Sequence, residues 1–303
     1  MRRWCWALFA TSVACSPPPE RTSPQASANR ASASGSSSTL RPSPGRARGT
    51  AALTRNADCE ACHPKQAAAW RASRHRQSAS NTAYQTAFAA EPSRFCRACH
   101  APESDADSPH PQPTDQLGVG CVTCHELELG VVLAAGEQVE IQPATRDVPH
   151  SIQRTRDFSG AGACASCHEF PFPGATTGPS AIGAASLMQS TLTEHAASRA
   201  KDRACAACHM PLSAGLRDHR FDQGRDPAWL RKKLEVEARS TAWRSLEIEL
   251  RQTNPAHAFP TGDLLRRLEV GAELIDEHGS VVMRDVVYMR REFRPPSSGV
   301  GRE

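Results

Sequence analysis

The sequence predicts a mainly α, loop-rich protein with a small C-terminal β-sheet, and three observations favour this class. Aromatic residues make up only 5% of the 303 positions and long apolar runs are absent, so a polypeptide core would be thin for this length. Five copies of Cys-x-x-Cys-His lie between residues 59 and 209, beside Ala-rich stretches that look helical. Beyond residue 245, apolar and charged residues alternate as they do in half-buried strands.

Ten of the twelve cysteines belong to these motifs, and the other two, Cys5 and Cys15, lie near the N-terminus. The spacing is typical of c-type haem attachment, because two sulfurs separated by two residues reach the vinyl groups on one porphyrin edge. The adjacent histidine then binds the iron. We predict five covalently attached haem c groups, held by Cys59, Cys62, His63, Cys96, Cys99, His100, Cys121, Cys124, His125, Cys164, Cys167, His168, Cys205, Cys208 and His209.

Three other kinds of site use paired cysteines. A thioredoxin-like redox pair needs one motif in a βαβ setting, whereas this chain has five. Structural zinc would join two motifs per metal and leave one over. Neither zinc nor a disulfide framework requires a histidine after every second cysteine, so the pattern favours haem over all three.

The pentahaem region is predicted to extend over residues 53–222. Its attachment histidines are spaced 37, 25, 43 and 41 residues apart. Since the chain offers little apolar surface of its own, we expect stacked haems to form the core, with short helices and long loops around them. In so short a region the rings are forced close together, which favours electron hopping.

Seven histidines remain for the sixth position of the irons, and four of them are predicted distal ligands. His75 follows the first motif on an Ala-rich helix, and His150 lies in a loop after the third. His219 lies in RDHRF after the last motif, and His257 in HAFPTG. The alternative at each position is an exposed or hydrogen-bonded histidine. Four candidates for five irons leave one iron whose sixth position is unassigned.

Three histidines are not predicted to be ligands. His110 lies in the Pro-rich loop SPHPQP, and His278 lies in a predicted hairpin turn. His195 aligns with Trp70 in a weak internal repeat between LTEHAASRA and QAAAWRASRH, so we interpret it as a packing residue.

Residues 1–15 are predicted to be a signal peptide, because two arginines precede the short apolar run WCWALFATSVA. This run is too short for a permanent membrane span. We interpret its end as a lipobox with an acylated Cys15, although Ser12 stands where leucine is usual; an ordinary cleavage site is the alternative. Residues 16–52, rich in Ser, Pro, Ala and Arg, are predicted to be a disordered tether.

Residues 223–303 are predicted to form a helix and a small β module. Asp-Pro at its start is typical of a helix N-terminus, and we expect a helix over 226–239. Alternation predicts a strand over 246–250, and two apolar runs, 268–274 and 281–289, flank the turn DEHG as a hairpin. We expect three or four strands in one sheet that packs on the haem region. A separate binding module is the alternative.

These motifs resemble those of multihaem cytochromes c of the cytochrome c-554 / c-prime family. The likeness covers most of residues 58–275 and is carried by CEACHPKQAAAWRASRH, GVGCVTCHE, CASCHEFPFP, STLTEHAASRAKDRACAACHMP, DHRF, NPAHAFPTG and LLRRLEV. It implies closely packed, mostly bis-histidine haems and electron transfer, and some relatives use an open haem on nitrogen compounds. Ala256 departs from the glycine that usually precedes the histidine. Relatives continue the sheet, so we expect the HxFPTG-containing C-terminal module to be truncated here.

The formal net charge of +4 would change sign in the haem-loaded protein, because ten propionates add roughly ten negative charges. Nothing in the sequence favours nucleic acid. We predict an electron carrier rather than an enzyme, exported to the periplasm or anchored at the outer membrane of a Gram-negative bacterium. Its partners would be other cytochromes or a membrane quinol-oxidising complex, with the membrane surface reached through Cys15. The alternatives are an oxidoreductase with one open haem, acting on a small nitrogen or sulfur oxide, and a scaffolding subunit.

Overall fold

The computed structural model of this chain describes residues 4–9, 46–126, 130–137, 141–171, 187–222, 226–242, 245–262 and 266–291. The predicted acylation site Cys15 and most of the predicted tether lie outside them. The chain divides into two compact units, one of residues 14–163 (the first unit) and one of residues 1–13 and 164–303 (the second unit). The first unit carries three of the Cys-x-x-Cys-His motifs and the second carries two.

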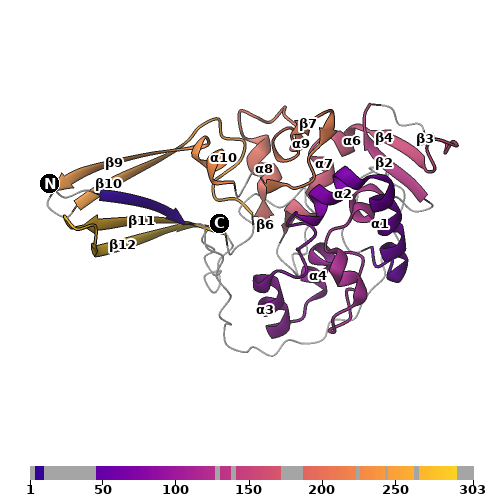
Figure 1. Ribbon diagram of the computed structural model, residues 1–303, viewed down its shortest axis with the longest axis horizontal. Coiled ribbons are helices and arrows are strands. Elements are labelled where there is room, and N and C mark those ends of the chain that lie inside the picture. The colour runs from indigo at the N-terminus through magenta and orange to yellow at the C-terminus, as the bar shows by residue number, and fades with distance from the viewer. Residues whose placement is uncertain are drawn as a thin grey trace, which may run out of the picture. The chain divides into compact units, whose positions relative to one another are not determined.

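The first unit is built from short helices that are followed by a small sheet (Figure 1). Its helices are α1 (Thr50–Cys62), α2 (Pro64–Arg71), α3 (Thr82–Ala90), α4 (Arg94–His100), the 3-10 helix η1 (Pro113–Leu117), α5 (Cys121–His125) and α6 (Arg156–Ser159). Strand β4 (Ser151–Thr155) is the middle of the sheet, parallel to β2 (Val131–Ala135) and antiparallel to β3 (Ile141–Gln142).

The apolar core of the first unit is small. One cluster of buried side chains consists of Ala52, Trp70, Leu117 and Val122, and a second consists of Ala79, Tyr84 and Ala101. Cysteines pack against both clusters: Cys59 and Cys121 against the first, and Cys96 against the second. The apolar side chains of the first unit thus gather beside the motifs.

The second unit has short helices and several antiparallel strand pairs. Its helices are α7 (Gly162–His168), α8 (Thr191–Ala196), α9 (Ala206–His209) and α10 (Pro227–Arg231). Two small pairs flank them, β5 (Glu169–Pro171) with β6 (Leu187–Ser190) and β7 (Leu212–Ser213) with β8 (Leu216–Arg217).

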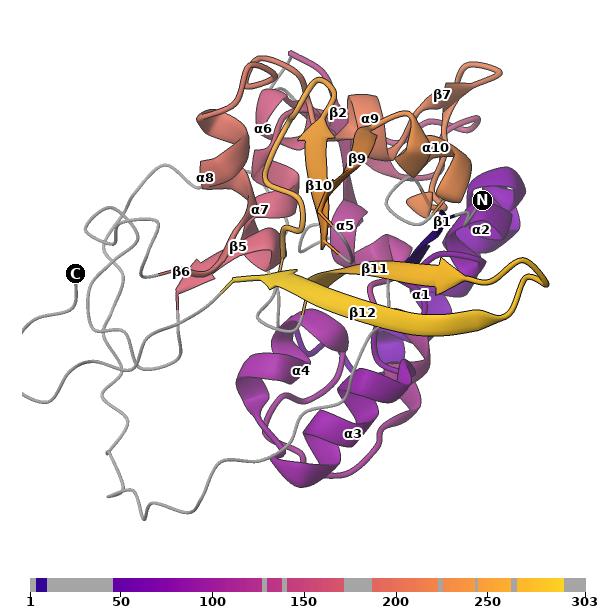
Figure 2. The same cartoon turned by 90° about the vertical axis from the view of Figure 1, so that its left-hand side faces the viewer.

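Longer strands follow in two further sheets. The first pairs β9 (Leu234–Ala242) with β10 (Ser245–Gln252). The second has the order β1-β11-β12, from β1 (Trp4–Phe9), β11 (Arg267–Ile275) and β12 (Val281–Arg290). Figure 2 shows β11 and β12 as a long ribbon joined by a turn. Among the described residues, no helix combines the length and the apolar character that a membrane span requires.

The mainly α class that the sequence predicts is wrong. Helices account for 34% of the structure and strands for 28%, and the strands form five small sheets. The helices are short as expected, and the longest described one, α1, has 13 residues. The sheets were missed because strands of two to five residues, such as β3 and β7, are too short to show a period-2 pattern.

The C-terminal predictions were partly right. The hairpin over 268–274 and 281–289 is confirmed by β11 and β12, and the strand over 246–250 by β10, in which exposed and half-buried residues alternate. The helix over 226–239 is wrong beyond Arg231, because the next residues pair with β10 as β9. The predicted single sheet is two sheets in the described part of the chain.

Candidate haem sites

All five Cys-x-x-Cys-His motifs lie at the ends of short helices. The second cysteine or the histidine is the last residue of α1, α4, α5, α7 and α9. Residues i and i+3 share one side of a helix, so the two sulfurs of each motif point in a similar direction. Cys62 is exposed and the other nine motif cysteines are half-buried. This arrangement suits two thioether bonds to one porphyrin edge.

The first and third motifs are tied together by Asn56, which is fully buried in α1. Its Oδ1 accepts hydrogen bonds from the backbone N–H of Cys121 (2.8 Å) and of Val122 (3.5 Å). These amides belong to the first turn of α5, where a helix has no internal acceptor for them. Asn56 therefore caps the helix of the third motif from the helix of the first. A Cβ on Gly120 would lie 2.7 Å from Asn56 Oδ1, which explains the glycine.

A network of buried charges fixes the other end of α5. Arg48 donates to the carbonyl oxygens of Val122 (3.1 Å) and Glu126 (2.9 Å), and to Glu103 Oε1 (3.1 Å). Glu103 is fully buried and also accepts from the Thr123 hydroxyl (2.9 Å). A cation at a helix C-terminus stabilises the unsatisfied carbonyl groups there. The segments that follow the second and third motifs are thus bound to one arginine.

Within the second unit, the fourth and fifth motifs meet at their first cysteines. A hydrogen bond from the side chain of Cys164 lowers the pKa of the Cys205 thiol to about 7, against burial that raises it. In the first unit, burial and, to a smaller extent, the neighbouring Cys59 raise the pKa of the Cys121 thiol to about 12. Each unit therefore brings the first cysteines of two motifs close together.

Hydrogen bonds at Nδ1 orient several of the imidazoles. His100 Nδ1 lies 2.9 Å from the carbonyl oxygen of Ser78, and His125 Nδ1 lies 3.0 Å from that of Leu133. His168 Nδ1 lies 3.1 Å from the side-chain amide nitrogen of Gln189. His100 and His125, which donate Nδ1–H to a carbonyl group, present an unprotonated Nε2, the usual metal ligand. At His168 the Gln189 amide donates to Nδ1 instead, which leaves the proton of the neutral ring on Nε2.

Both attachment histidines of the second unit have a lowered pKa. Burial lowers the pKa of His209, and the nearby His257 lowers it further. Desolvation by the surrounding protein lowers the pKa of His168 to about 4, and the neighbouring His209 contributes to this shift. Part of the residue is nevertheless exposed. Neutral imidazoles with an accessible nitrogen are what metal binding needs.

Two of the predicted distal histidines face an attachment histidine. The ring centroids of His150 and His63 are 6.4 Å apart, and those of His257 and His209 are 6.1 Å apart. An iron between two imidazoles, with metal–nitrogen bonds of about 2 Å, separates the ring centroids by roughly 6 Å. Among the described residues, His150 Nδ1 is buried without a hydrogen-bond partner. Both histidine pairs fit an iron between them.

The other two predicted distal histidines lie in turns. His75 is four residues beyond the end of α2, not on that helix, and its carbonyl oxygen accepts from Val119 N–H (2.8 Å). Gly118, at φ +54°, allows this approach, because a Cβ there would lie 2.3 Å from the His75 carbonyl oxygen. His219 follows β8, and its Nδ1 lies 2.8 Å from the carbonyl oxygen of Arg217.

The histidines not predicted as ligands lie elsewhere. His278 is exposed in the turn between β11 and β12, 3.8 Å from a Glu277 oxygen. The carbonyl oxygen of His110 accepts from Arg97 (3.1 Å), and His195 lies in the last turn of α8. Trp70, with which His195 was aligned, is buried in the core as expected and donates to the Val119 carbonyl oxygen (2.8 Å).

Sequence reasoning missed two residues around the second motif. The ring of Tyr84 stacks on the imidazole of His100, with centroids 4.3 Å apart and planes 8° apart. Arg97, between the motif's two cysteines, is buried, forms an ion pair with Asp115 (3.0 Å) and lies over the Phe88 ring (4.7 Å). Asn81, whose side chain caps α3 at the Tyr84 amide, was the available signal for a helix that presents this tyrosine.

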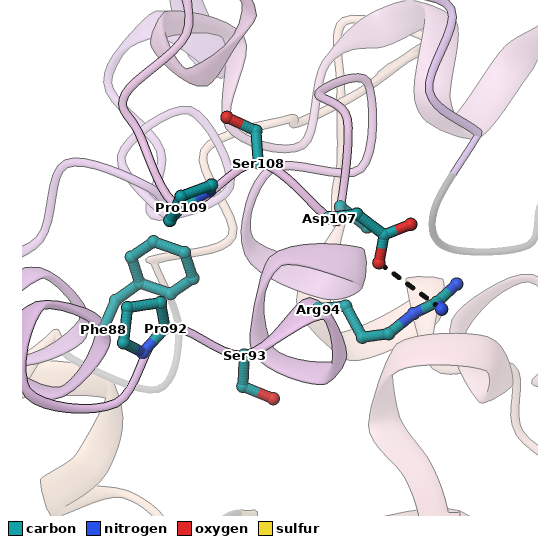
Figure 3. A pocket seen from close by; sticks show the side chains of 8 residues that line it. Phe88, Pro92, Ser93, Arg94, Asp107, Ser108 and Pro109 are labelled. Atoms are coloured by element: carbon teal, nitrogen blue, oxygen red, sulfur yellow. Dashed lines mark ion pairs between the residues drawn. The ribbon is translucent and has the colours of Figure 1, made fainter. Parts of the chain in front are cut away.

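A cavity of about 340 Å³ opens between the end of α3 and the start of α4 (Figure 3). Phe88 and Pro92 line one side and Ser108 and Pro109 the other, and an Arg94–Asp107 ion pair (3.4 Å) closes one end. The cavity has no attachment histidine in its lining.

The sequence and the fold were compared with those of known proteins. Residues 58–126, with the first three motifs, match the family model of cytochrome c554 and c-prime. The chain resembles multihaem cytochromes c. A penta-haem cytochrome c552 from Thermochromatium tepidum has a similar crystal structure, with a TM-score of 0.54 and 22% sequence identity over 80% of this chain and 74% of that one. No curated protein matched the sequence. The multihaem cytochrome fold therefore extends well beyond the matched motifs.

Proposed function

We propose that this chain is an exported pentahaem c-type cytochrome that transfers electrons between redox partners in a bacterial respiratory chain. The observation that carries the proposal is the pairing of motifs within each unit, Cys59 near Cys121 and Cys164 against Cys205. Porphyrins attached at these positions would be neighbours, and short distances between rings favour rapid electron transfer. The similarity to a penta-haem cytochrome supports the count of five.

The chain's own residues hold and orient the cofactor. Bound haem supplies the reversible one-electron couple of its iron. The paired cysteines fix each porphyrin edge, and the attachment histidine approaches the iron. Carbonyl groups such as those of Ser78 and Leu133 hold Nδ1, so Nε2 would be free to bind the iron.

The distal ligands proposed here follow the facing pairs. His150 serves the iron bound by His63, and His257 serves the iron bound by His209, because their ring separations match an intervening metal. His75 and His219 are the proposed distal ligands of two further irons. One iron then has no assigned sixth ligand, which keeps an oxidoreductase acting on a small nitrogen or sulfur oxide as the second candidate.

Export and anchoring complete the proposal. Residues 1–15 act as the signal peptide, so strand β1 (Trp4–Phe9) is lost on processing and β11 keeps β12 as its partner. Acylated Cys15 and the tether that follows it hold the haem region at a membrane surface. The predicted tether, residues 16–52, is too long at its end, because Arg48 and Ala52 belong to the folded first unit. The partners are then other cytochromes or a membrane quinol-oxidising complex. Two features of the N-terminal sequence support export and anchoring: two arginines precede a short apolar run, and small residues precede Cys15.

The test is to express the whole chain in a host that matures c-type cytochromes, then to measure intact mass and magnetic spectra. We expect a mass increase of five haem groups and a spectrum dominated by low-spin haem. A colourless protein of bare polypeptide mass contradicts the proposal. One high-spin haem whose spectrum shifts on addition of nitrite or hydroxylamine favours the oxidoreductase over the carrier.

A further inference from the structure

The segment Ala256–Gly262, which contains His257, belongs to no helix or strand, and we call it the distal turn. Its backbone is bound instead by side chains from other elements. Glu194 of α8 is the main one: its Oε2 accepts from the N–H of Ala258 (3.2 Å) and from the hydroxyl of Thr261 (2.5 Å). Hydrogen bonds to a carboxylate are stronger than those between neutral groups.

The same carboxylate is itself held in place. Its Oε1 accepts from the Ser190 hydroxyl (2.9 Å), at the start of α8. The hydroxyls of Thr191 and Thr261 lie 3.0 Å apart and join the same two segments again. Glu194 therefore bridges a fixed helix end to the residue directly after His257.

Two further contacts restrain the distal turn without reaching its histidine side chain. Gln252 donates to the His257 carbonyl oxygen (3.2 Å), and Arg291 donates to the carbonyl oxygens of Met188 (2.9 Å) and Gly262 (3.5 Å). Relatives usually have glycine at the position of Ala256, which suggests a positive φ there. In this chain the positive φ lies two residues earlier, at Asn254 (φ +52°), and Ala256 does not need one. Of these contacts, the Glu194 carboxylate is the one that binds the residue directly after His257.

We propose that Glu194 is a positioning residue, which holds the distal turn so that His257 stays opposite His209 and closes that iron to external ligands. The inference rests on the proposed function, because it assumes an iron between the two imidazoles. Without the carboxylate, the Ala258 amide and the Thr261 hydroxyl lose their acceptor, and the turn is free to carry His257 away. A five-coordinate iron then binds small molecules that a bis-histidine iron excludes.

The experiment compares the holoprotein with its Glu194→Ala and Glu194→Gln variants by carbon monoxide titration of the reduced state and by electron paramagnetic resonance of the oxidised state. Glu194→Ala is expected to gain about one carbon monoxide site per chain and a matching high-spin signal. Glu194→Gln keeps one acceptor oxygen and is expected to gain less than about half a site. Glu277→Ala, an exposed change in the β11–β12 turn, is the control and should match the unaltered chain.

His257→Ala removes the proposed distal ligand itself, so its carbon monoxide binding and high-spin signal serve as the reference for an opened haem. If His257→Ala opens a haem and Glu194→Ala does not, the positioning role is overturned while the proposed function stands. If the unaltered chain carries no haem, or His257→Ala changes no haem, the ligand assignment beneath the inference is wrong. Should Glu194→Ala fail to fold, Thr261→Val removes one donor to the carboxylate. It should open the same haem to a smaller extent, and an unchanged spectrum would refute the proposal.

Discussion

Single residues with long-range partners set the geometry around the motifs. Gly118 lets the backbone pass against the His75 carbonyl oxygen, and Asn56 and Glu194 each bind a segment more than sixty residues away. The five motifs could be found in the sequence, because each consists of five consecutive residues, and their role in haem attachment stays a prediction. Asn56 and Glu194 were not, because each has an ordinary helical context and its partner is defined only by the folded chain.

Gly118→Ala tests the close approach at His75. The substitution places a methyl group 2.3 Å from a carbonyl oxygen and also keeps a positive φ of +54°. Gly215→Ala is the matched control, since its φ is +77° and no atom lies within 4 Å of its Cβ. Both should lose about 1–2 kcal/mol of unfolding free energy from backbone strain, and Gly118→Ala should lose roughly 1–3 kcal/mol more from the clash. Urea unfolding measures both; equal losses would mean that the turn relaxes freely.

At the scale of elements, the helices that carry motifs are too short to be stable alone, since α5 has five residues and α9 has four. Their ends are satisfied by side chains from other segments, as Asn56 and Arg48 do for α5. Strand β10 was predictable from its alternating pattern. Strand β9 was not, because LEVEARSTA has good helix formers at its start, and cross-strand pairs such as Arg239–Glu247 (2.6 Å) and Arg251–Glu235 (2.5 Å) form only in the folded hairpin.

Asn56→Ala tests whether α5 depends on a cap from α1. The change leaves two buried amides of α5 without an acceptor, so the unfolding free energy should fall by about 1–3 kcal/mol. Glu60→Gln is the control. Glu60 accepts a hydrogen bond from the side-chain nitrogen of Asn56 (2.8 Å), so the substitution does not touch the Asn56 oxygen that caps α5. Its cost should stay below about 1 kcal/mol. Urea unfolding followed by fluorescence compares them, and a similar cost for both would remove the capping role.

At the scale of the whole molecule, composition and fold agree that the polypeptide alone has little core. The buried apolar side chains of the described residues are few, and several cysteines pack directly against them. The division into units of three and two motifs could not be predicted from spacing, because the 43 residues between the third and fourth attachment histidines hardly exceed the 41 between the fourth and fifth. Contacts, not intervals in sequence, decide which motifs meet.

The charge of the loaded protein follows from this composition. The sequence alone carries +4, and about ten propionates should make the holoprotein acidic. Isoelectric focusing of the purified holoprotein should therefore give an isoelectric point below 7, and binding to a basic partner should weaken as salt rises. A basic isoelectric point at full haem content would show that the propionates are neutralised. The predicted binding to a basic partner would then be wrong.

The cap on α5 has a consequence for how the protein is made. A ribosome delivers the chain amino end first, so Asn56 emerges sixty-five residues before the amide it receives. The helix that bears the third haem can reach its final form only after the helix of the first exists to close its open end. The cap thus couples completion of the third motif's helix to the presence of the first motif's helix.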